Sequence, residues 1–268
     1  MNAIEIVGML KMFSDNYGLD KKGKWMGGSL PYIRSIDKNK DPLNKNRIIA
    51  SYARFPARKT WRITSKILTW MLSKISNKRF KHFTLRGDIG TKQILKSIEN
   101  RYKMNYKDAA VMVKKFDVKE MFTNLKRKEI KKAIEWLFKW TTIRICSHTR
   151  TKPEHINFTV DLNNNMKVRA GRRTPGTGTI GMNYDDLWNV ILMDFYFSYA
   201  QIGNKLLYQK EGCPIGGFLS SVFANVVCAY QENRFMESLD ADLMERIAGI
   251  RLMDDLMLFV AYDYSNEN

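Results

Sequence analysis

The stretch Arg251-Leu252-Met253-Asp254-Asp255-Leu256-Met257-Leu258-Phe259 places two adjacent carboxylates in the middle of an apolar run. The run predicts a buried hairpin over residues 250–261. Adjacent carboxylates repel each other, and burial makes their ionised forms costlier still. Because a bound cation is the usual remedy, the pattern indicates a divalent metal site. Taken alone, the stretch leaves open a second interpretation, a surface turn that carries two Asp residues.

Two further motifs precede this hairpin. Residues 116–122 (FDVKEMF) place Asp117 at the end of a strand expected to be buried, and residues 212–221 (GCPIGGFLSS) form a glycine-rich turn that feeds a helix. The order of carboxylate strand, glycine turn and carboxylate hairpin suits two-metal phosphoryl transfer, in which carboxylates hold two Mg²⁺ ions. Glycine lets the backbone approach a flat base or sugar closely.

The composition points to a polyanionic partner. Lys and Arg number 45 against 27 Asp and Glu, so the formal charge of the 268 residues is +18. Nucleic acid is the commonest partner for such an excess. A basic ribonucleoprotein component without chemistry of its own would show the same charge. A membrane partner is not expected, since no long basic amphipathic helix stands apart from the globular pattern.

The cysteines and histidines exclude several other classes of site. Cys146, Cys213 and Cys228 form no CxxC pair or zinc spacing, which favours reduced thiols in an intracellular compartment, nuclear or cytoplasmic. The three histidines are scattered, which argues against a histidine metal site or a Ser-His-Asp triad. Neither a secretory signal nor a membrane-spanning run is predicted.

Periodicity predicts an alternation of helices and strands. Residues 13–46 and 171–181 read as loops. The predicted helices are Arg58–Ile75, Thr91–Tyr102, Lys126–Trp140, Asp185–Phe195 and Phe218–Met236. The first begins a basic segment that reaches Lys81. The second is expected to turn Ile94, Leu95 and Ile98 inward. The predicted strands are 47–52, 109–118, two within 155–170, a hairpin over 197–210 that turns at Gly203-Asn204, and the 250–261 hairpin.

These segments resemble reverse transcriptases. Residues 212–225 are similar to the family's G-x-P-Q-G-G-x-x-S-P-x-x-A-N, and the hairpin resembles its Y-x-D-D box, with Leu252 in place of Tyr. Residues 117–125 (DVKEMFTNL) are similar to the D-V-x-x-L-F-T-N-I of Penelope-like retroelements. The aromatic segment 195–209 and residues 31–51 also resemble that group. The pattern, which extends to group II intron-type enzymes, covers about residues 31–260.

The chain departs from the family pattern at several positions. Ile215 replaces Gln, Ser221 replaces Pro, and Ile48 stands where a proline is usual after Arg47. The carboxylates Asp117, Asp254 and Asp255 are all present. Substitutions around an intact set of carboxylates favour a divergent enzyme over an inactive relic.

The resemblance implies an α+β fold, a right-hand polymerase palm with a ferredoxin-like antiparallel sheet, preceded by a mostly helical fingers region. We expect an N-terminal segment over 1–30, fingers over 31–108 and a palm over 109–268 with a loop and hairpin insertion at 141–182. Only 13 residues follow Asp255. The resemblance therefore implies that the primer grip and thumb are absent, and that the sheet ends at an exposed edge near 250–260.

The implied activity is RNA-directed DNA polymerisation with two Mg²⁺ ions, Mn²⁺ being an alternative. The implied partners are an RNA template, a DNA primer, a dNTP and a possible further chain that supplies a thumb. A telomerase-like enzyme, an RNA-directed RNA polymerase and a non-catalytic nucleic-acid-binding protein remain as alternatives.

The resemblance also assigns residues. Asp117, Asp254 and Asp255, with the backbone of Val118, would hold the metal ions. Phe122 would be the steric gate against ribonucleotides, and alternatively a core aromatic. The other nucleotide-binding candidates are Arg47 and Lys38 at the triphosphate, and Ile215, Gly216 and Gly217 below the nascent base pair. The alternatives are solvated charges and a helix-entry turn.

Two basic segments are candidates for binding the nucleic-acid strands. The residues concerned are Arg58, Lys59 and Arg62 on the basic helix, and Arg169, Arg172 and Arg173 in or near the 171–181 loop. For each segment, a solvated charged face is the alternative.

Overall fold

The computed structural model describes residues 2–23, 25–37, 46–75, 82–85, 90–106, 109–172 and 174–263. The chain divides into two compact units. Unit 1 comprises Met1–Ile75 and Phe122–Phe223, and unit 2 comprises Ser76–Met121 and Ala224–Asn268. The division falls inside helix α7 (Ser220–Glu237). Helices and strands are mixed in both units, so the predicted α+β class is confirmed.

Unit 1 contains two sheets in its described residues, one of four strands in the order β2-β1-β7-β8 and one of three strands in the order β5-β4-β6. Its elements are α1 (Ala3–Asn16), α2 (Asp20–Gly23), β1 (Tyr32–Asp37), β2 (Asn46–Ser51), α3 (Arg58–Ile75), α5 (Arg127–Thr149), β4 (Asn157–Asp161), β5 (Lys167–Gly171), β6 (Thr179–Met182), α6 (Tyr184–Tyr196), β7 (Tyr199–Ile202) and β8 (Lys205–Tyr208), and it also holds the start of α7.

The core of unit 1 forms around α3. The helix has the predicted bounds, and its inward positions, among them Trp61, Ile63 and Ile67, are fully buried. The Phe158 ring of β4 lies between α3 and α6, with its centroid 6.1 Å from Trp70 and 5.1 Å from Tyr184. A regular 3.6-residue apolar pattern therefore predicted this helix correctly.

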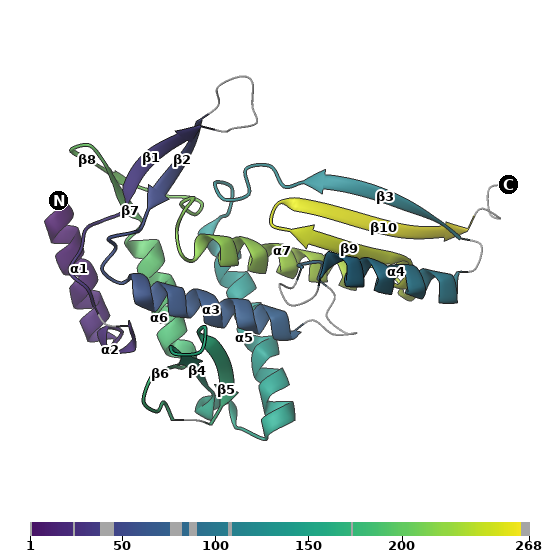
Figure 1. Ribbon diagram of the computed structural model, residues 1–268, viewed down its shortest axis with the longest axis horizontal. Helices are drawn as coiled ribbons and strands as arrows, with labels where there is room; N and C mark the ends of the chain where they lie inside the picture. The colour runs from purple at the N-terminus through teal and green to yellow at the C-terminus, as the bar shows by residue number, and fades with distance from the viewer. Residues whose placement is uncertain are drawn as a thin grey trace. The chain divides into compact units, whose positions relative to one another are not determined.

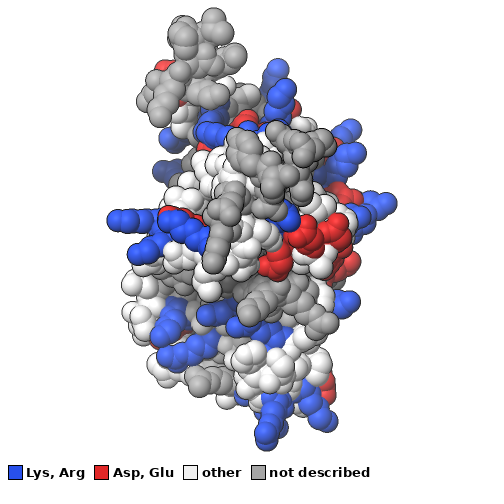
Figure 2. All heavy atoms as spheres, turned by 90° about the vertical axis from the view of Figure 1, so that its right-hand side faces the viewer, with Lys and Arg blue, Asp and Glu red and all other residues white. Residues whose placement is uncertain are grey.

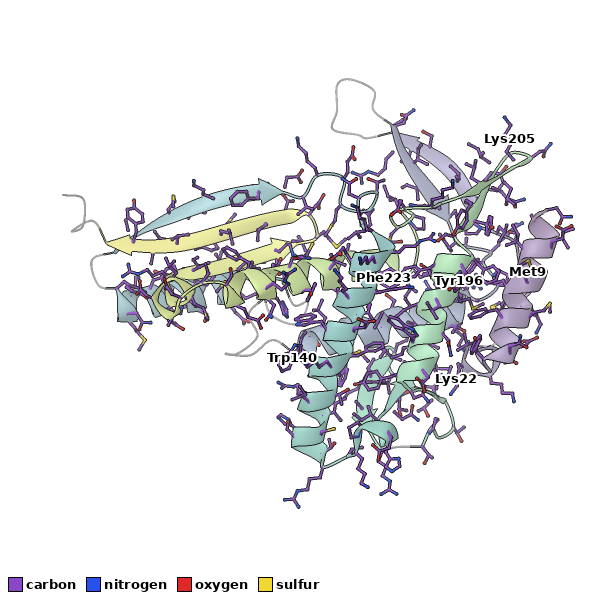
Figure 3. The ribbon with its side chains drawn as sticks, turned by 180° about the vertical axis from the view of Figure 1, so that it is seen from behind. Met9, Lys22, Trp140, Tyr196, Lys205 and Phe223 are labelled. Carbon is purple, nitrogen blue, oxygen red and sulfur yellow. The ribbon has the colours of Figure 1, made fainter. Side chains whose placement is uncertain are left out.

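Further side chains connect the helices of unit 1. Phe223, at the start of α7, packs against Phe195 of α6 with ring centroids 5.7 Å apart. Lys22 of α2 forms an ion pair of 3.0 Å with Asp186 of α6. Both Phe223 and Lys22 are labelled in Figure 3.

Unit 2 is built on one antiparallel sheet in the order β3-β10-β9. It contains α4 (Thr91–Asn105), β3 (Ala109–Asp117), α8 (Ala241–Arg246), β9 (Ile247–Leu252), β10 (Asp255–Asp263) and the rest of α7. Figure 1 shows the three strands side by side. The predicted strand 109–118 and hairpin 250–261 are therefore confirmed.

Helix α4 covers one end of this sheet. Tyr102 packs there with Ala248, Ile250, Phe259 and Ala261 in a buried cluster. Its hydroxyl lies 2.9 Å from the carbonyl oxygen of Arg246 and 3.0 Å from that of Phe259. Apolar burial and one buried hydroxyl thus fix this end of the sheet.

Only two of the three positions expected on the inner face of α4 face the core. Ile94 and Ile98 pack against the cluster as predicted. Leu95 is exposed, so its predicted inward position is wrong.

The edges of the unit 2 sheet differ from the prediction. β10 is the central strand, and the backbone of Phe83–Leu85 hydrogen-bonds to Arg251 on the far side of β9. Within the described residues, β3 and β9 are the outer strands, and Val111, Val113 and Phe116 of β3 are exposed. The expectation of a buried β3 is therefore wrong. The expected edge does lie at β9, but it is bridged at Arg251, and the β10 part of residues 250–260 is central. A strand paired on one side only cannot be recognised from its apolar composition.

Two segments predicted to be loops contain regular structure. Residues 13–46 include α2 and β1, and residues 171–181 include the start of β6. These strands are short, and their local patterns are weak. Both strands form through pairing with partners, β1 with β2 and β7, and β6 with β4.

Candidate functional site

The β9–β10 hairpin turns through the two residues Met253 and Asp254. Leu252 and Asp255 form the last pair before the turn. Met253 has a φ of 56°, which lies in the left-handed region that non-glycine residues rarely adopt. Backbone held in such a conformation costs about 1–3 kcal/mol and is concentrated at functional sites. The turn that carries Asp254 is therefore strained.

Asp117 lies directly opposite Asp255 in the antiparallel pair of β3 and β10. Directly opposite side chains share a face of the sheet, with Cβ atoms about 4.5–5.5 Å apart. The Val118 N–H donates to the carbonyl oxygen of Asp254 at 2.9 Å. The backbone thus gathers all three predicted carboxylates at one end of the sheet.

The side chains themselves do not form a three-ligand group. Among the described residues, no three His, Cys, Asp or Glu side chains are placed to hold a metal ion. Asp255 instead forms an ion pair with Lys115, Nζ to Oδ1, at 3.0 Å. The backbone register and the carboxylate donors fit a hard cation such as Mg²⁺, while the present side-chain placement commits Asp255 to an ammonium group.

Lys115 is a residue that the sequence interpretation missed. It lies two positions before Asp117, so the two side chains share a face of the strand. The pKa of Lys115 is raised by its hydrogen bond to Asp255, then by the charge of Asp255 and, more weakly, by that of Asp117. Because like charges directly opposite each other destabilise a sheet, this lysine offsets the repulsion between the two carboxylates.

The burial predicted for the Asp pair is wrong. Asp254 and Asp255 are exposed. The buried charge of the stretch is Arg251, whose side chain is 1% exposed. Burial therefore gives no reason for a cation at the Asp pair, whereas the register of Asp117 opposite Asp255 does bring carboxylates together.

The glycine segment lies in unit 1 and packs against β2. The Ala50 N–H donates to the carbonyl oxygen of Ile215 at 2.8 Å. Gly216 has a φ of +100°, and a Cβ there would lie 2.3 Å from the Ala50 carbonyl oxygen. Gly216 is therefore required for the close contact with the β2 backbone. Gly217 is similarly confined, since its Cβ would lie 2.5 Å from Ser220 Oγ.

The same segment also contacts the chain after Asp117. Cys213 N–H donates to the carbonyl oxygen of Phe122 at 2.7 Å, and Gly212 N–H donates to that of Leu125 at 3.1 Å. Phe122 is half-buried, and Arg47 is exposed on β2. Phe122, Arg47 and the glycines thus belong to unit 1, whereas Asp117 and Val118 belong to unit 2. Lys38 lies outside the described residues.

The basic candidates are more varied than the sequence suggested. Arg58 donates to the Ala53 carbonyl oxygen at 2.5 Å, which gives it a structural role. The exposed Arg62 guanidinium lies 5.5 Å from the Phe218 ring centroid. Lys59 is half-buried, while Arg169 and Arg172 are exposed, and Arg173 lies outside the described residues. Figure 2 shows basic side chains spread over the visible face rather than collected in one patch.

Comparison with known proteins identifies the fold. No protein-family model matches the sequence, and no curated protein matches it. The structure is similar to telomerase from Candida tropicalis in complex with a TWJ fragment of telomeric RNA, with a TM-score of 0.61 and 16% identity over 95% of this chain and 40% of that chain. Telomerase from Candida albicans in complex with a TWJ fragment of telomeric RNA is also similar, with a TM-score of 0.60 and 14% identity over 92% of this chain and 41% of that chain.

A third similar structure is apo telomerase from Candida tropicalis truncated from the C-terminal domain, with a TM-score of 0.59 and 16% identity over 94% of this chain and 49% of that chain. The chain therefore spans less than half the length of the telomerase chains that it matches. At these identities the likeness concerns the fold alone, which this chain shares with part of these telomerase chains. No described helix has both the length and the apolar character to cross a membrane.

Proposed function

We propose that this chain is the fingers and palm part of an RNA-directed DNA polymerase that adds a dNTP to a primer 3′-hydroxyl. The observation that carries the proposal is the register of Asp117 opposite Asp255, with Asp254 in the intervening turn. The likeness to telomerase supports it at the level of the fold. The Penelope-like motifs favour a retroelement origin, and the structural neighbours favour the telomerase-like alternative.

Asp117, Asp254 and Asp255, together with the Val118 carbonyl group, would hold two Mg²⁺ ions. When bound, such ions stabilise the attacking and leaving oxygens of an in-line displacement. For Asp255 to take part, its carboxylate must leave Lys115, which its exposed position allows. Arg47, with its planar fork of donors, would bind the phosphates of the dNTP.

Phe122 would select the sugar, because a half-buried ring excludes a 2′-hydroxyl by its bulk. Replacement of Phe122 by Ala should raise ribonucleotide incorporation relative to deoxynucleotide incorporation. An unchanged ratio in an active variant would return Phe122 to a packing role.

The test of the proposal is single-nucleotide addition to a DNA primer on an RNA template, with enzyme in excess and Mg²⁺ or Mn²⁺ present. Asp254→Asn should lower the rate by more than about 100-fold, since outer-shell partners of a metal alone contribute 10–100-fold. Asp242→Asn is the matched control, because Asp242 is an exposed acid of α8 that pairs with Arg246. Equal rates for Asp254→Asn and the wild type would refute the proposed site.

A second candidate is a nucleic-acid-binding protein without catalysis. The pairing of Asp255 with Lys115 favours it. Binding should then weaken with salt, log K declining linearly in log salt with a slope of about 0.9 per neutralised duplex phosphate. Asp254→Asn should leave this binding intact. Salt-dependent binding without any Asp254-dependent nucleotide addition would favour this candidate over the polymerase.

A further inference from the structure

Arg251 is a buried arginine inside an apolar strand. Arginine is almost never fully buried unless it is paired. Its side chain is 1% exposed, and its Nε donates to Oε1 of Glu232, itself 9% exposed on α7. The other carboxylate oxygen of Glu232 accepts the Phe83 N–H at 2.8 Å. A buried pair of this kind is weak support for stability, because desolvation offsets much of the attraction.

The remaining donors of Arg251 lead to the strained turn. Nη1 donates to the carbonyl oxygen of Met253 at 2.9 Å and to Oδ1 of Asn225 at 2.8 Å. Nη2 donates to Thr84 Oγ1 at 2.5 Å and to the Asn225 carbonyl oxygen at 3.3 Å. All five N–H donors of the guanidinium are thereby used. Lysine, with three donors on one nitrogen, could not make the same set.

Asn225 holds the same turn from α7. While its Oδ1 accepts from Arg251, its Nδ2 lies 3.5 Å from Sδ of Met253. Met253 is thus held through its backbone and its side chain in the conformation with φ of 56°. The next residue is Asp254, whose carbonyl oxygen accepts the Val118 N–H.

We infer that Arg251, Asn225 and Glu232 are positioning residues that hold the strained Met253 turn and thereby place Asp254 beside Asp117. This inference rests on the proposed function for its purpose, the presentation of carboxylates to divalent cations. The geometric part stands without it. Glu232 orients the Arg251 guanidinium, which holds the Met253 carbonyl group, and Asn225 holds the Met253 side chain.

The Val118 amide reports on the position of Asp254 in the metal-free protein. Asn225→Ala retains the buried ion pair and removes only the contacts of the Asn225 side chain. We expect the Val118 amide of this variant to exchange about tenfold faster, the equivalent of one typical hydrogen bond. Amides in the far half of β10 should keep their rates. Tyr102→Phe is the matched control, since it removes a buried hydroxyl at the other end of the same sheet.

Arg251→Lys provides a second variant, which keeps the buried positive charge and loses the planar guanidinium with its five donors. It should also accelerate exchange at Val118. Unchanged exchange at Val118 in both variants would overturn the positioning role. Equally faster exchange at Val118 in Tyr102→Phe would also overturn it, because the whole sheet would then have been destabilised rather than the Met253 turn.

A Mn²⁺ titration followed by electron paramagnetic resonance separates the inference from the proposed function. Asn225→Ala and Arg251→Lys should weaken Mn²⁺ binding by about tenfold or more, and Tyr102→Phe should not. Asp254→Asn should remove the binding. If Asp254→Asn binds Mn²⁺ like the wild type, the proposed metal site fails, while the exchange data still decide the positioning role. Intact Mn²⁺ affinity in both positioning variants, with binding lost in Asp254→Asn, would overturn the inference alone.

Discussion

Glu232 in unit 2 and Asp194 in unit 1 are both removed from bulk water to a large extent, but they meet different partners. Glu232 accepts from the Arg251 guanidinium and from the Phe83 amide. Asp194, half-buried on α6, accepts from the Trp61 indole at 2.7 Å. Desolvation raises the pKa of Asp194 to about 6, against the opposing effects of the Trp61 hydrogen bond and the Arg127 charge.

The two acids differ in what offsets their loss of contact with water. In unit 2 the acid is matched by a full positive charge, and the pair leads on to the Met253 turn. In unit 1 the acid has a neutral donor, and Arg127 donates its hydrogen bonds to Tyr208 and Gln209 instead. We therefore expect stability to depend on the partner of Glu232 in unit 2, and on the pH through Asp194 in unit 1.

The largest expected effect is in unit 2. Glu232→Ala leaves Arg251 buried without its counter-charge, which typically costs about 3–5 kcal/mol. Urea unfolding followed by circular dichroism measures this loss. Glu99→Ala is the matched control, because Glu99 is an exposed acid of α4 that pairs with Lys103 in the same unit. If both variants have the wild-type midpoint, the Arg251–Glu232 pair is not a stabilising feature of the fold.

Replacing both partners sharpens the same comparison. Arg251→Met combined with Glu232→Leu should recover most of the stability that Glu232→Ala loses, because apolar replacements of a buried pair are often neutral or better. The exchange rate at Val118 should nevertheless remain high, since Met offers no donor to the Met253 carbonyl group. If both the unfolding midpoint and the Val118 exchange rate return to their wild-type values, the pair contributes to packing alone.

The next effect is the pH dependence of unit 1. The folded state holds the Asp194 proton more tightly than the unfolded state, whose pKa is near 3.8. Between about pH 4 and 6 the folded state therefore binds more protons, and stability falls as pH rises through this window. The pKa shift corresponds to a change in unfolding free energy of at most about 3 kcal/mol, and the partial exposure of Asp194 reduces this value.

Asp194→Asn should remove this dependence. The variant should gain stability relative to the wild type on going from pH 4 to pH 7, whatever its packing cost at either pH. The groups near Asp194 are Trp61, Arg127, Cys213 and Tyr52. Burial raises the pKa of both the Cys213 thiol and the Tyr52 hydroxyl, so neither group titrates in this window. Parallel stability profiles for variant and wild type would contradict the assignment to Asp194.

The sequence predicted those elements whose pattern is local. The α3 bounds, the hairpin at Gly203-Asn204 and the strand ending at Asp117 were all correct. β3 also pairs with the carboxylate hairpin, which brings the carboxylates assigned to one metal site to the same end of the sheet. The three local elements rest on a repeating apolar pattern or on a turn that few residues can form.

The elements that the sequence did not predict depend on partners distant in the chain. β3 reads as buried because Val111, Met112 and Val113 are apolar, but burial is decided by neighbours on both sides. Arg251 lies within the apolar stretch 251–259, but its local pattern indicated no role for it. A single arginine in an apolar run was the available signal, because its burial requires partners. Lys115 gave no such signal, since exposed lysines are common.

The smallest expected effect concerns the Lys115–Asp255 pair. The side chains are 69% and 57% exposed, so the pair should add little to stability, and Lys115→Met should leave the unfolding midpoint almost unchanged. The ammonium group nevertheless competes with a cation for Asp255, and the substitution should therefore strengthen Mn²⁺ binding severalfold. Lys114→Met is the matched control, because Lys114 carries the same charge on the opposite face of β3. Equal strengthening by both variants would assign the effect to net charge, and would contradict a specific contact between Lys115 and the carboxylate end.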